Sequence, residues 1–165
     1  MNLKFNSYAC FKSNIMKKLI SLIFLSIAIT SCGVLWEYRS INELEGMTWS
    51  ASDKQIFDFE IKQDGNYEVI IILRHLHGFA MNTIPVHLNM QKDVSIVDDN
   101  YDIPIRDKTG DYLGDGGGDL WDVEHSALES IPMTTGNYKV IISQTSGSDG
   151  LDLLMEVGLM IKKVE

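Results

Sequence analysis

The 165-residue sequence contains little cysteine and little proline, and each scarcity excludes a class of protein. Two cysteines cannot build a disulfide-rich scaffold or a four-cysteine zinc site. Three prolines, with 45% hydrophobic residues, exclude collagen-like and disordered chains. Basic residues are scarce after residue 31: Lys4, Lys12, Lys17 and Lys18 precede that point, which leaves 10 basic against 23 acidic residues and a net charge of −13. So acidic a body would repel a phosphate backbone, and we expect no nucleic-acid partner.

The sequence also lacks a hydrophobic run long enough to cross a bilayer as a helix, which needs about 20 apolar residues. The apolar run Leu19–Ile29 has eleven residues, follows the basic pair Lys17-Lys18 and precedes small residues. This layout is typical of a secretory signal peptide, which we place at residues 1–31. Residues 1–15 precede the better start at Met16, and we interpret them as an upstream extension.

A cysteine follows the apolar run directly. The segment Ile29-Thr30-Ser31-Cys32 resembles a bacterial lipobox, in which the thiol receives a diacylglyceryl group, the signal is cut before the cysteine and the new amine is acylated. The alternative is an ordinary signal peptide with an incidental cysteine. Because each buried CH₂ of an acyl chain contributes about 0.8 kcal/mol, lipidation at Cys32 would anchor the protein to a membrane.

The rest of the chain has no convincing helical stripe and instead alternates apolar and polar residues with period two. Tyr67 to Arg74 is nearly continuous in hydrophobicity, as expected for a central strand covered on both faces. We expect two exceptions, a short helix at 123–130 and a turn at 151–155. The expected strands are 57–61, 67–74, 84–90, 101–105, 138–144 and 157–161.

These strands are separated by turn signals too short for βαβ crossovers, which favours antiparallel pairing. The pattern predicts an all-β fold, an antiparallel β-sandwich of about six to eight short strands preceded by the signal peptide. We place the sandwich domain at residues 50–165. Residues 32–49 are polar and aperiodic, and we interpret them as a lipid-anchored tether. Its residues from Gly33 to Trp49 would reach at most about 56 Å at ~3.3 Å per residue.

Aspartate and glycine are concentrated between Asp107 and Asp122 (DKTGDYLGDGGGDLWD). Such a density of carboxylates could hold Ca²⁺, which takes roughly six to eight oxygen ligands. The spacing does not match an EF-hand, and no lysine follows the glycines as in a phosphate-binding loop. The alternative, which the turn residues favour, is a hairpin with a turn at 107–110 and a bend at 114–118. The calcium candidates are Asp107, Asp111, Asp115 and Asp119.

Three histidines could form a metal site. His75 and His77 are two residues apart at the end of the central strand, which places them on one face, and His87 could be a third zinc ligand. No spacing here is diagnostic, and surface histidines at a strand end are the simpler interpretation. We therefore expect neither a metal nor a cofactor.

Residue types of a catalytic triad also occur, in Asp122, His125 and Ser126, but no nucleophile elbow surrounds the serine. No pair of acids is singled out for glycoside hydrolysis. We expect no enzymatic activity, although a hydrolase that uses scattered acids remains an alternative.

Four segments follow one another in an order found in a known family, and they cover most of residues 50–163. The segments are 67–75, 79–84, 103–119 and 136–159, and the residues that carry the likeness are Arg74, Asn82, Gly110, Gly114, Gly116, Gly118, Asp119, Gly136 and Gly158. On these residues the chain resembles the GldH-type gliding motility lipoproteins of the Bacteroidota. Tyr112 and Gly117 depart from the family pattern, in which tryptophan and an aromatic residue are expected.

The resemblance implies a non-catalytic lipoprotein that works with envelope proteins of the gliding and type IX secretion assembly. It also implies that the aspartate–glycine segment defines the fold rather than a site. Surface-exported lipoproteins of this phylum resemble one another in an acidic cluster after the cysteine, and here only Glu37 is acidic in residues 33–37. We therefore expect an outer-membrane protein whose domain faces the periplasm. The alternative function is a calcium- or glycan-binding sandwich module on the envelope.

Overall fold

Alternating apolar and polar residues form strands throughout the computed structural model, which describes residues 36–164. In that range eight strands have six or more residues, which agrees with the expected six to eight, and three more have three residues each. The elements are β1 (Tyr38–Glu43), the 3₁₀ turn η1 (Glu45–Met47), β2 (Thr48–Ser50), β3 (Gln55–Ile61), β4 (Gly65–Leu76), β5 (Thr83–Gln91), β6 (Ser95–Pro104), β7 (Asp115–Gly117), β8 (Leu120–Met133), β9 (Gly136–Gln144), β10 (Gly150–Asp152) and β11 (Leu154–Val164).

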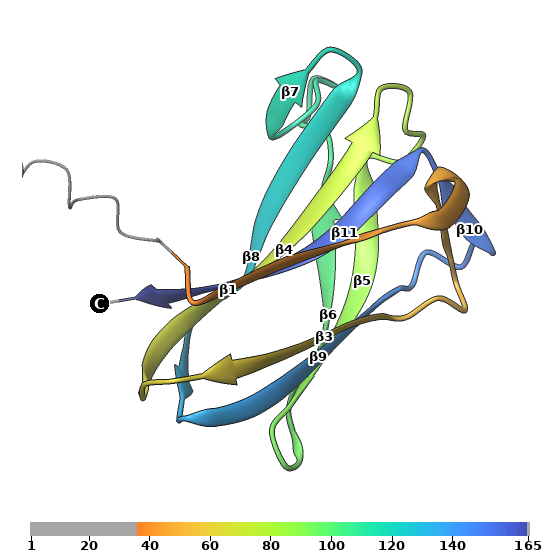
Figure 1. Cartoon of the computed structure of the whole chain (residues 1–165). Coiled ribbons are helices and arrows are strands. Elements are labelled where there is room, and N and C mark those ends of the chain that lie inside the picture. The colour runs from red at the N-terminus through yellow and green to blue at the C-terminus, as the bar shows by residue number, and fades with distance from the viewer. Residues whose placement is uncertain (1–35, 165) are drawn as a thin grey trace, which may run out of the picture. The chain divides into compact units, whose positions relative to one another are not determined.

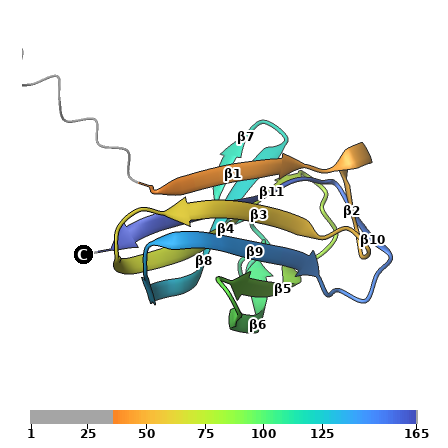
Figure 2. The same ribbon diagram turned by 60° about the horizontal axis from the view of Figure 1, so that its bottom comes forward.

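The long strands form two sheets that pack face to face (Figure 1). The first sheet has the order β1-β11-β4-β8-β7, the second sheet has the order β3-β9-β5-β6, and β10 pairs separately with β2. Every one of these pairings is antiparallel. β1 and β3 lie side by side at one margin (Figure 2), where the rings of Tyr38 and Phe59 stack with centroids 5.0 Å apart. The predicted all-β antiparallel sandwich is confirmed.

The core lies between the sheets and is built from the inward-facing residues of each strand. β3 shows the pattern most simply, because Phe57, Phe59 and Ile61 are buried and the intervening Asp58 and Glu60 are exposed. The same alternation in β5 and β9 supplies further apolar residues of the core, and β4 and β11, which are buried more continuously, supply others. Burial of this apolar surface is the main favourable contribution to folding.

The first sheet carries a second apolar cluster on its outer face. Ile70 and Ile72 alternate with the core residues of β4, and Met160 alternates with those of β11, so the three point away from the main core yet stay buried. Gly158 lies among them, and a Cβ at that position would come within 3.0 Å of Ile41 Cγ1 and 3.1 Å of Ile72 Cβ. β4 is therefore covered on both faces, as its sequence predicted.

β8 corrects the short helix expected at 123–130. Its pairing with β4 is interrupted by two register shifts opposite the Tyr67–Ile70 part of β4, and each shift inserts an extra residue into β8. Three apolar residues of β8 pair with core residues of β4: Val123, Leu128 and Ile131. Because of the inserted residues, they are not spaced by multiples of two in the sequence. The resulting spacing resembles that of a helix, and the pairing with β4 decides the structure.

Two smaller expectations are also corrected. The turn expected at 151–155 is divided between β10 and the start of β11, with Leu153 at a positive φ of 65° between them. The polar residues 98–100, expected to precede a strand, lie inside β6. β6 is an edge strand of its sheet, and only Val97 and Ile103 of its residues are buried, so its sequence carries little apolar signal.

The tether expected at 32–49 is corrected only in its described part, because β1 joins the first sheet from Tyr38 on. β1 pairs along its full length with β11, and Trp49 is fully buried. β1 is an edge strand whose inward positions include Asn42, which donates a hydrogen bond to Gln55 Oε1 at 3.1 Å. Such polar residues at the rim conceal the alternation in the sequence. The signal peptide and Cys32 lie outside the described residues, and no helix within 36–164 has the length and apolar character needed to cross a bilayer.

Candidate functional site

The aspartate–glycine segment starts with a tight turn built around Asp107. The N–H of Gly110 donates to the carbonyl of Asp107 at 3.2 Å, which closes the turn. The Asp107 carboxylate accepts hydrogen bonds from the hydroxyl and N–H of Thr109, at 2.7 and 2.8 Å, and from the N–H of Asp111 at 3.0 Å. These hydrogen bonds, led by the Thr109 hydroxyl, lower the pKa of Asp107. One calcium candidate is thus already engaged in holding a turn.

The remaining calcium candidates do not converge. Asp111 accepts from the Thr109 hydroxyl at 3.0 Å, whereas Asp115 begins β7 and Asp119 lies in the turn between β7 and β8. Among residues 36–164, no three His, Cys, Asp or Glu side chains are grouped so that they could hold a metal ion. What the described geometry offers at this segment is a hydrogen-bonded hairpin.

Two glycines let the hairpin lie close to β8. Gly114 has a φ of +88°, and a Cβ there would lie 2.0 Å from the carbonyl oxygen of Asp122. A Cβ on Gly116 would lie 2.8 Å from the ring of Trp121. Both contacts are shorter than any side chain tolerates, so only glycine permits this approach.

Arg106 and Tyr112 bind this segment to the loop after β4. The guanidinium of Arg106 lies 3.8 Å from the centre of the Tyr112 ring and donates to the carbonyls of Phe79 and Gly110, at 3.0 and 3.1 Å. It also donates to the Tyr112 hydroxyl, which accepts the N–H of Gly78 at 2.7 Å. This combination of a cation–π contact and four hydrogen bonds fixes the segment on the sandwich.

The Tyr112 ring lies among three further rings, and we call Arg106, Tyr112, His75, His77 and Trp121 the Tyr112 cluster. The centroid of Tyr112 is 5.1 Å from those of His75 and Trp121 and 5.2 Å from that of His77. The cluster therefore joins β4, β8 and the aspartate–glycine segment through their side chains.

His75 is fully buried in this cluster, and burial lowers its pKa. Its Nδ1 lies 3.0 Å from the carbonyl oxygen of Leu76, which can only accept, so Nδ1 carries the proton of the neutral ring. Nε2 of His75 and Nε1 of Trp121 are buried and have no hydrogen-bond partner within residues 36–164. A neutral histidine at this position packs against aromatic rings and does not act as a charged group.

The three-histidine alternative is not formed, and the simpler interpretation of surface histidines is wrong for His75, which is fully buried. His75 and His77 both lie against Tyr112, but His87 points from the outer face of β5 in the other sheet. There, His87 Nε2 lies 2.8 Å from the carboxylate of Asp98. His75 and His77 therefore share one neighbour, and His87 lies apart from them.

Arg74 is the centre of an ion-pair network on the outer face of the first sheet. It binds Asp122 through two hydrogen bonds of 2.6 and 2.8 Å and Glu156 through a third of 3.0 Å. The hydrogen bonds from Arg74 lower the pKa of Asp122, and the two carboxylates raise the pKa of Arg74. The network joins the three central strands β11, β4 and β8.

The same network separates the residues of the hypothetical triad. Asp122 and Ser126 pair with Arg74 and Ile70 and point to the outer face, whereas His125 pairs with Ile71 on the inner side. A relay needs the acid, the base and the nucleophile on one face. The three residues cannot act together in this arrangement.

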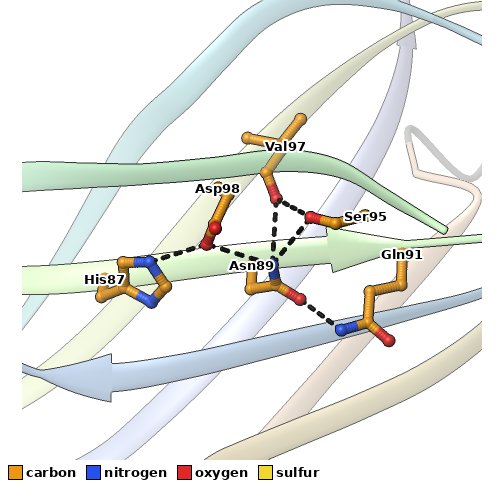
Figure 3. Close-up of polar contacts among 6 residues, drawn as sticks. All are labelled: His87, Asn89, Gln91, Ser95, Val97 and Asp98. Carbon is orange, nitrogen blue, oxygen red and sulfur yellow. Dashed lines mark hydrogen bonds and ion pairs between the residues drawn. The ribbon is translucent and has the colours of Figure 1, made fainter.

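A polar network covers the outer face of the second sheet at β5 and β6 (Figure 3). Asn89 donates to Ser95 Oγ at 2.9 Å and to Asp98 Oδ1 at 3.1 Å, and Asp98 also contacts His87. The Gln91 amide donates to the Asn89 carbonyl oxygen at 2.5 Å. These side chains satisfy one another, and their evident effect is to hold the β5–β6 hairpin in register.

Comparison with known proteins decides the family. The sequence model described as GldH lipoprotein matches residues 37–161, which run from the start of the sandwich into β11. The chain belongs to the GldH lipoprotein family. The resemblance seen in the sequence is thereby confirmed, and the protein is a gliding-motility-associated lipoprotein at the level of its family. No curated protein matches it.

Solved structures add little to the GldH assignment. A family 35 carbohydrate-binding module from Clostridium thermocellum aligns at 12% identity over 73% of this chain and 97% of its own, with a TM-score of 0.34. Latent PorU from Porphyromonas gingivalis aligns at 14% identity over 79% of this chain and 14% of its own, with a TM-score of 0.33. A structure of the Gx strain of infectious bursal disease virus aligns at 9% identity over 76% of this chain and 32% of its own, with a TM-score of 0.34. Likeness at this level carries no argument about function.

Other residues of the GldH motif lie where chain segments meet. The carbonyl of Asn82 accepts the N–H groups of Ile105 and Arg106, at 2.8 and 3.1 Å, and so links the start of β5 to the end of β6. Gly136 begins β9 with a φ of +143°, and a Cβ there would lie 2.8 Å from Lys92 Cε. We propose that the motif of this GldH protein specifies these contacts.

No pattern in the sequence predicts the Tyr112 cluster or the Arg74 network as a unit. Arg74 and Asp122 are 48 residues apart, and Arg74 and Glu156 are 82 apart, so only the pairing of β4 with its neighbours brings them together. An arginine next to an aspartate–glycine segment that also contains Tyr112 was the one available signal.

Proposed function

We propose that this GldH-family protein is a lipid-anchored, non-catalytic component of a cell-envelope assembly that serves gliding or type IX secretion. The observation that carries the proposal is the GldH match over residues 37–161, which spans both sheets of the sandwich. Four residues separate Cys32, at the end of the lipobox-like segment, from Glu37, where the match begins, so the proposed anchor directly precedes the family domain.

The geometry of the described domain supports a scaffold rather than a catalyst. Several of the candidate groups already have structural partners: Asp107 holds a turn, Arg74 binds two carboxylates, and His87 contacts Asp98. A protein of this kind acts through the surfaces that it offers to partners. Its net charge of −13 after residue 31 favours partners with basic surfaces.

We further propose that the anchor lies in the outer membrane and that the domain faces the periplasm. The support is the sequence after Cys32, Gly33-Val34-Leu35-Trp36, which contains no acidic residue. Proteinase K added to intact cells should leave the C-terminal region intact and should remove it after permeabilisation. Digestion without permeabilisation, with a periplasmic control intact, would contradict this orientation.

The assembly role is tested by affinity purification from cross-linked membranes, followed by mass spectrometry. We expect the tagged protein to recover envelope proteins of the gliding or secretion assembly, and we expect Cys32→Ala to lose them because it leaves the membrane. Cys10→Ala, in the expected upstream extension, is the matched control and should behave as wild type. Recovery of the protein alone from the membrane fraction would contradict the role.

A further inference from the structure

The outer face of the first sheet contains a groove at the point where the described chain begins. Trp36, Arg39, Glu124, Met160 and Lys162 line this groove, which has a volume of about 400 Å³. Its apolar floor is continuous with the second apolar cluster, because Met160 belongs to both. Trp36 is 43% exposed, whereas Met160, which lines the same groove, is buried.

The charge of the groove differs from that of the domain. Two of its five lining residues, Arg39 and Lys162, are basic and one, Glu124, is acidic, whereas the chain after residue 31 has a net charge of −13. Lys162 also contacts Glu68 at 3.7 Å, and Arg39 has no ion-pair partner among residues 36–164. Long cationic side chains over an apolar floor, next to a tryptophan, are the combination that favours a membrane interface, where the cations reach headgroup phosphates.

The length of chain outside the structure decides which surface can occupy the groove. Only Gly33, Val34 and Leu35 separate Cys32 from Trp36, so an extended chain allows at most about 14 Å between the acylated residue and the tryptophan. β1 alone, with six residues, spans about 20 Å, so the domain cannot turn its far end toward the bilayer. With the proposed acyl group on Cys32, the end of the first sheet that carries Trp36 would lie next to the membrane.

We infer that the Trp36 groove is a membrane-contact site, with the Trp36 ring at the headgroup level and Arg39 and Lys162 directed at lipid phosphates. The inference rests on the proposed lipid anchor at Cys32 and goes beyond it, because the anchor would bring the Trp36 end near the bilayer without deciding which face of that end touches lipid. The outer face of the second sheet then points away from the bilayer and remains available to proteins.

The test uses the full-length mature lipoprotein in phosphatidylcholine vesicles that contain brominated phosphatidylcholine. Of the three tryptophans, Trp49 is fully buried and Trp121 is partly buried in the Tyr112 cluster, so Trp36 should account for the fluorescence that the bromine quenches. We expect quenching in the wild type and in Trp121→Phe and its loss in Trp36→Phe. Persistence of the same quenching in Trp36→Phe would overturn the inference.

Charge reversal gives a second readout with a matched control. Arg39→Glu with Lys162→Glu should reduce the quenching severalfold without changing acylation, because the groove no longer attracts phosphates. Lys139→Glu makes the same kind of change on the outer face of the second sheet and should leave the quenching unchanged. Equal effects of the two changes would overturn the inference.

The anchor and the orientation can fail separately. The mass of the N-terminal tryptic peptide shows whether Cys32 is acylated, and flotation shows whether the protein is on the vesicles. An unacylated Cys32 would overturn both the proposed anchor and the membrane contact. An acylated protein that floats with the vesicles but shows no quenching of Trp36 would overturn the membrane contact alone.

Discussion

The two sheets share one core, but their outer faces differ in how much apolar surface they bury. On the first sheet, Ile70, Ile72 and Met160 are buried beneath longer side chains, and an arginine network crosses the three central strands. On the second sheet, polar side chains at β5 and β6 bond to one another, and Ile56 stands 49% exposed. The first outer face is therefore organised by burial and the second by surface hydrogen bonds, which indicates different neighbours for the two faces.

The largest effect is expected in the hairpin at the β7 edge of the first sheet. Gly114→Val should destabilise the domain by about 3 kcal/mol or more, because a positive φ and a contact with the Asp122 carbonyl act together. Gly117→Val is the matched control, since a Cβ at Gly117 meets nothing within 4 Å, and we expect a change within about 0.5 kcal/mol. Chemical denaturation measures both. A neutral Gly114→Val would show that the hairpin is not bound to β8 as described.

A pair of isoleucines tests the two outer faces directly. Ile72 is 4% exposed on the first sheet, and Ile72→Ala should cost about 2–4 kcal/mol of the free energy of unfolding. Ile56→Ala, on the outer face of the second sheet, should cost less than about 1 kcal/mol because half of its side chain already faces water. Equal costs in denaturant titrations would erase the distinction between the faces.

The fold was predictable from the sequence wherever a strand buries one face. Phe57, Phe59 and Ile61 alternate in the sequence and lie inward in the structure, and the continuous hydrophobic run of β4 marked it as central. Prediction failed for β1, β6 and β8. β1 and β6 bury too few residues to show a period, and β8 has a period disrupted by its register shifts.

The candidate site was less predictable, because its contacts join residues that are far apart in the chain. The turn at Asp107 could be anticipated from Asp107 and Gly110, which carry local conformational preferences. The approach of Tyr112 to His75 could not, because it depends on how the segment after β6 folds back onto β4. Turns can be predicted from local conformational preferences, whereas a cluster such as that of Tyr112 forms only when the strands have assembled.

The arginine network should make the first sheet sensitive to acid. The pKa of Asp122 is lowered in the folded protein. Its contribution to the free energy of unfolding is therefore complete above the unfolded pKa of about 3.9 and is lost as the pH falls from there through the lower pKa of the folded state. Arg74→Met should cost about 1 kcal/mol at pH 7, since the groups are partly exposed, and should flatten the loss of stability below pH 4.

Thermal melting between pH 2.5 and pH 7 measures this effect. Arg74→Lys keeps the charge but cannot form the paired hydrogen bonds to Asp122, and we expect an intermediate profile. Identical acid profiles for the wild type and Arg74→Met would show that other carboxylates determine the acid sensitivity.

The smallest effect is expected on the second outer face. Asn89→Ala removes hydrogen bonds to Ser95 and Asp98 that water can replace, so it should cost less than about 1 kcal/mol. The measurement is the urea midpoint, with Asn100→Ala on the neighbouring strand as a control. A cost as large as that of Ile72→Ala would mean that this face is organised more tightly than its exposure indicates.

The mass of the mature N-terminus tests most directly the claim that this domain is held at a membrane by Cys32. No lysine or arginine lies between Lys18 and Arg39, so trypsin should release an N-terminal peptide that ends at Arg39. The account predicts the peptide from Cys32 to Arg39, with the mass of a diacylglyceryl group and an N-acyl chain added. An unmodified peptide, or one that still contains residues 19–31, would contradict it.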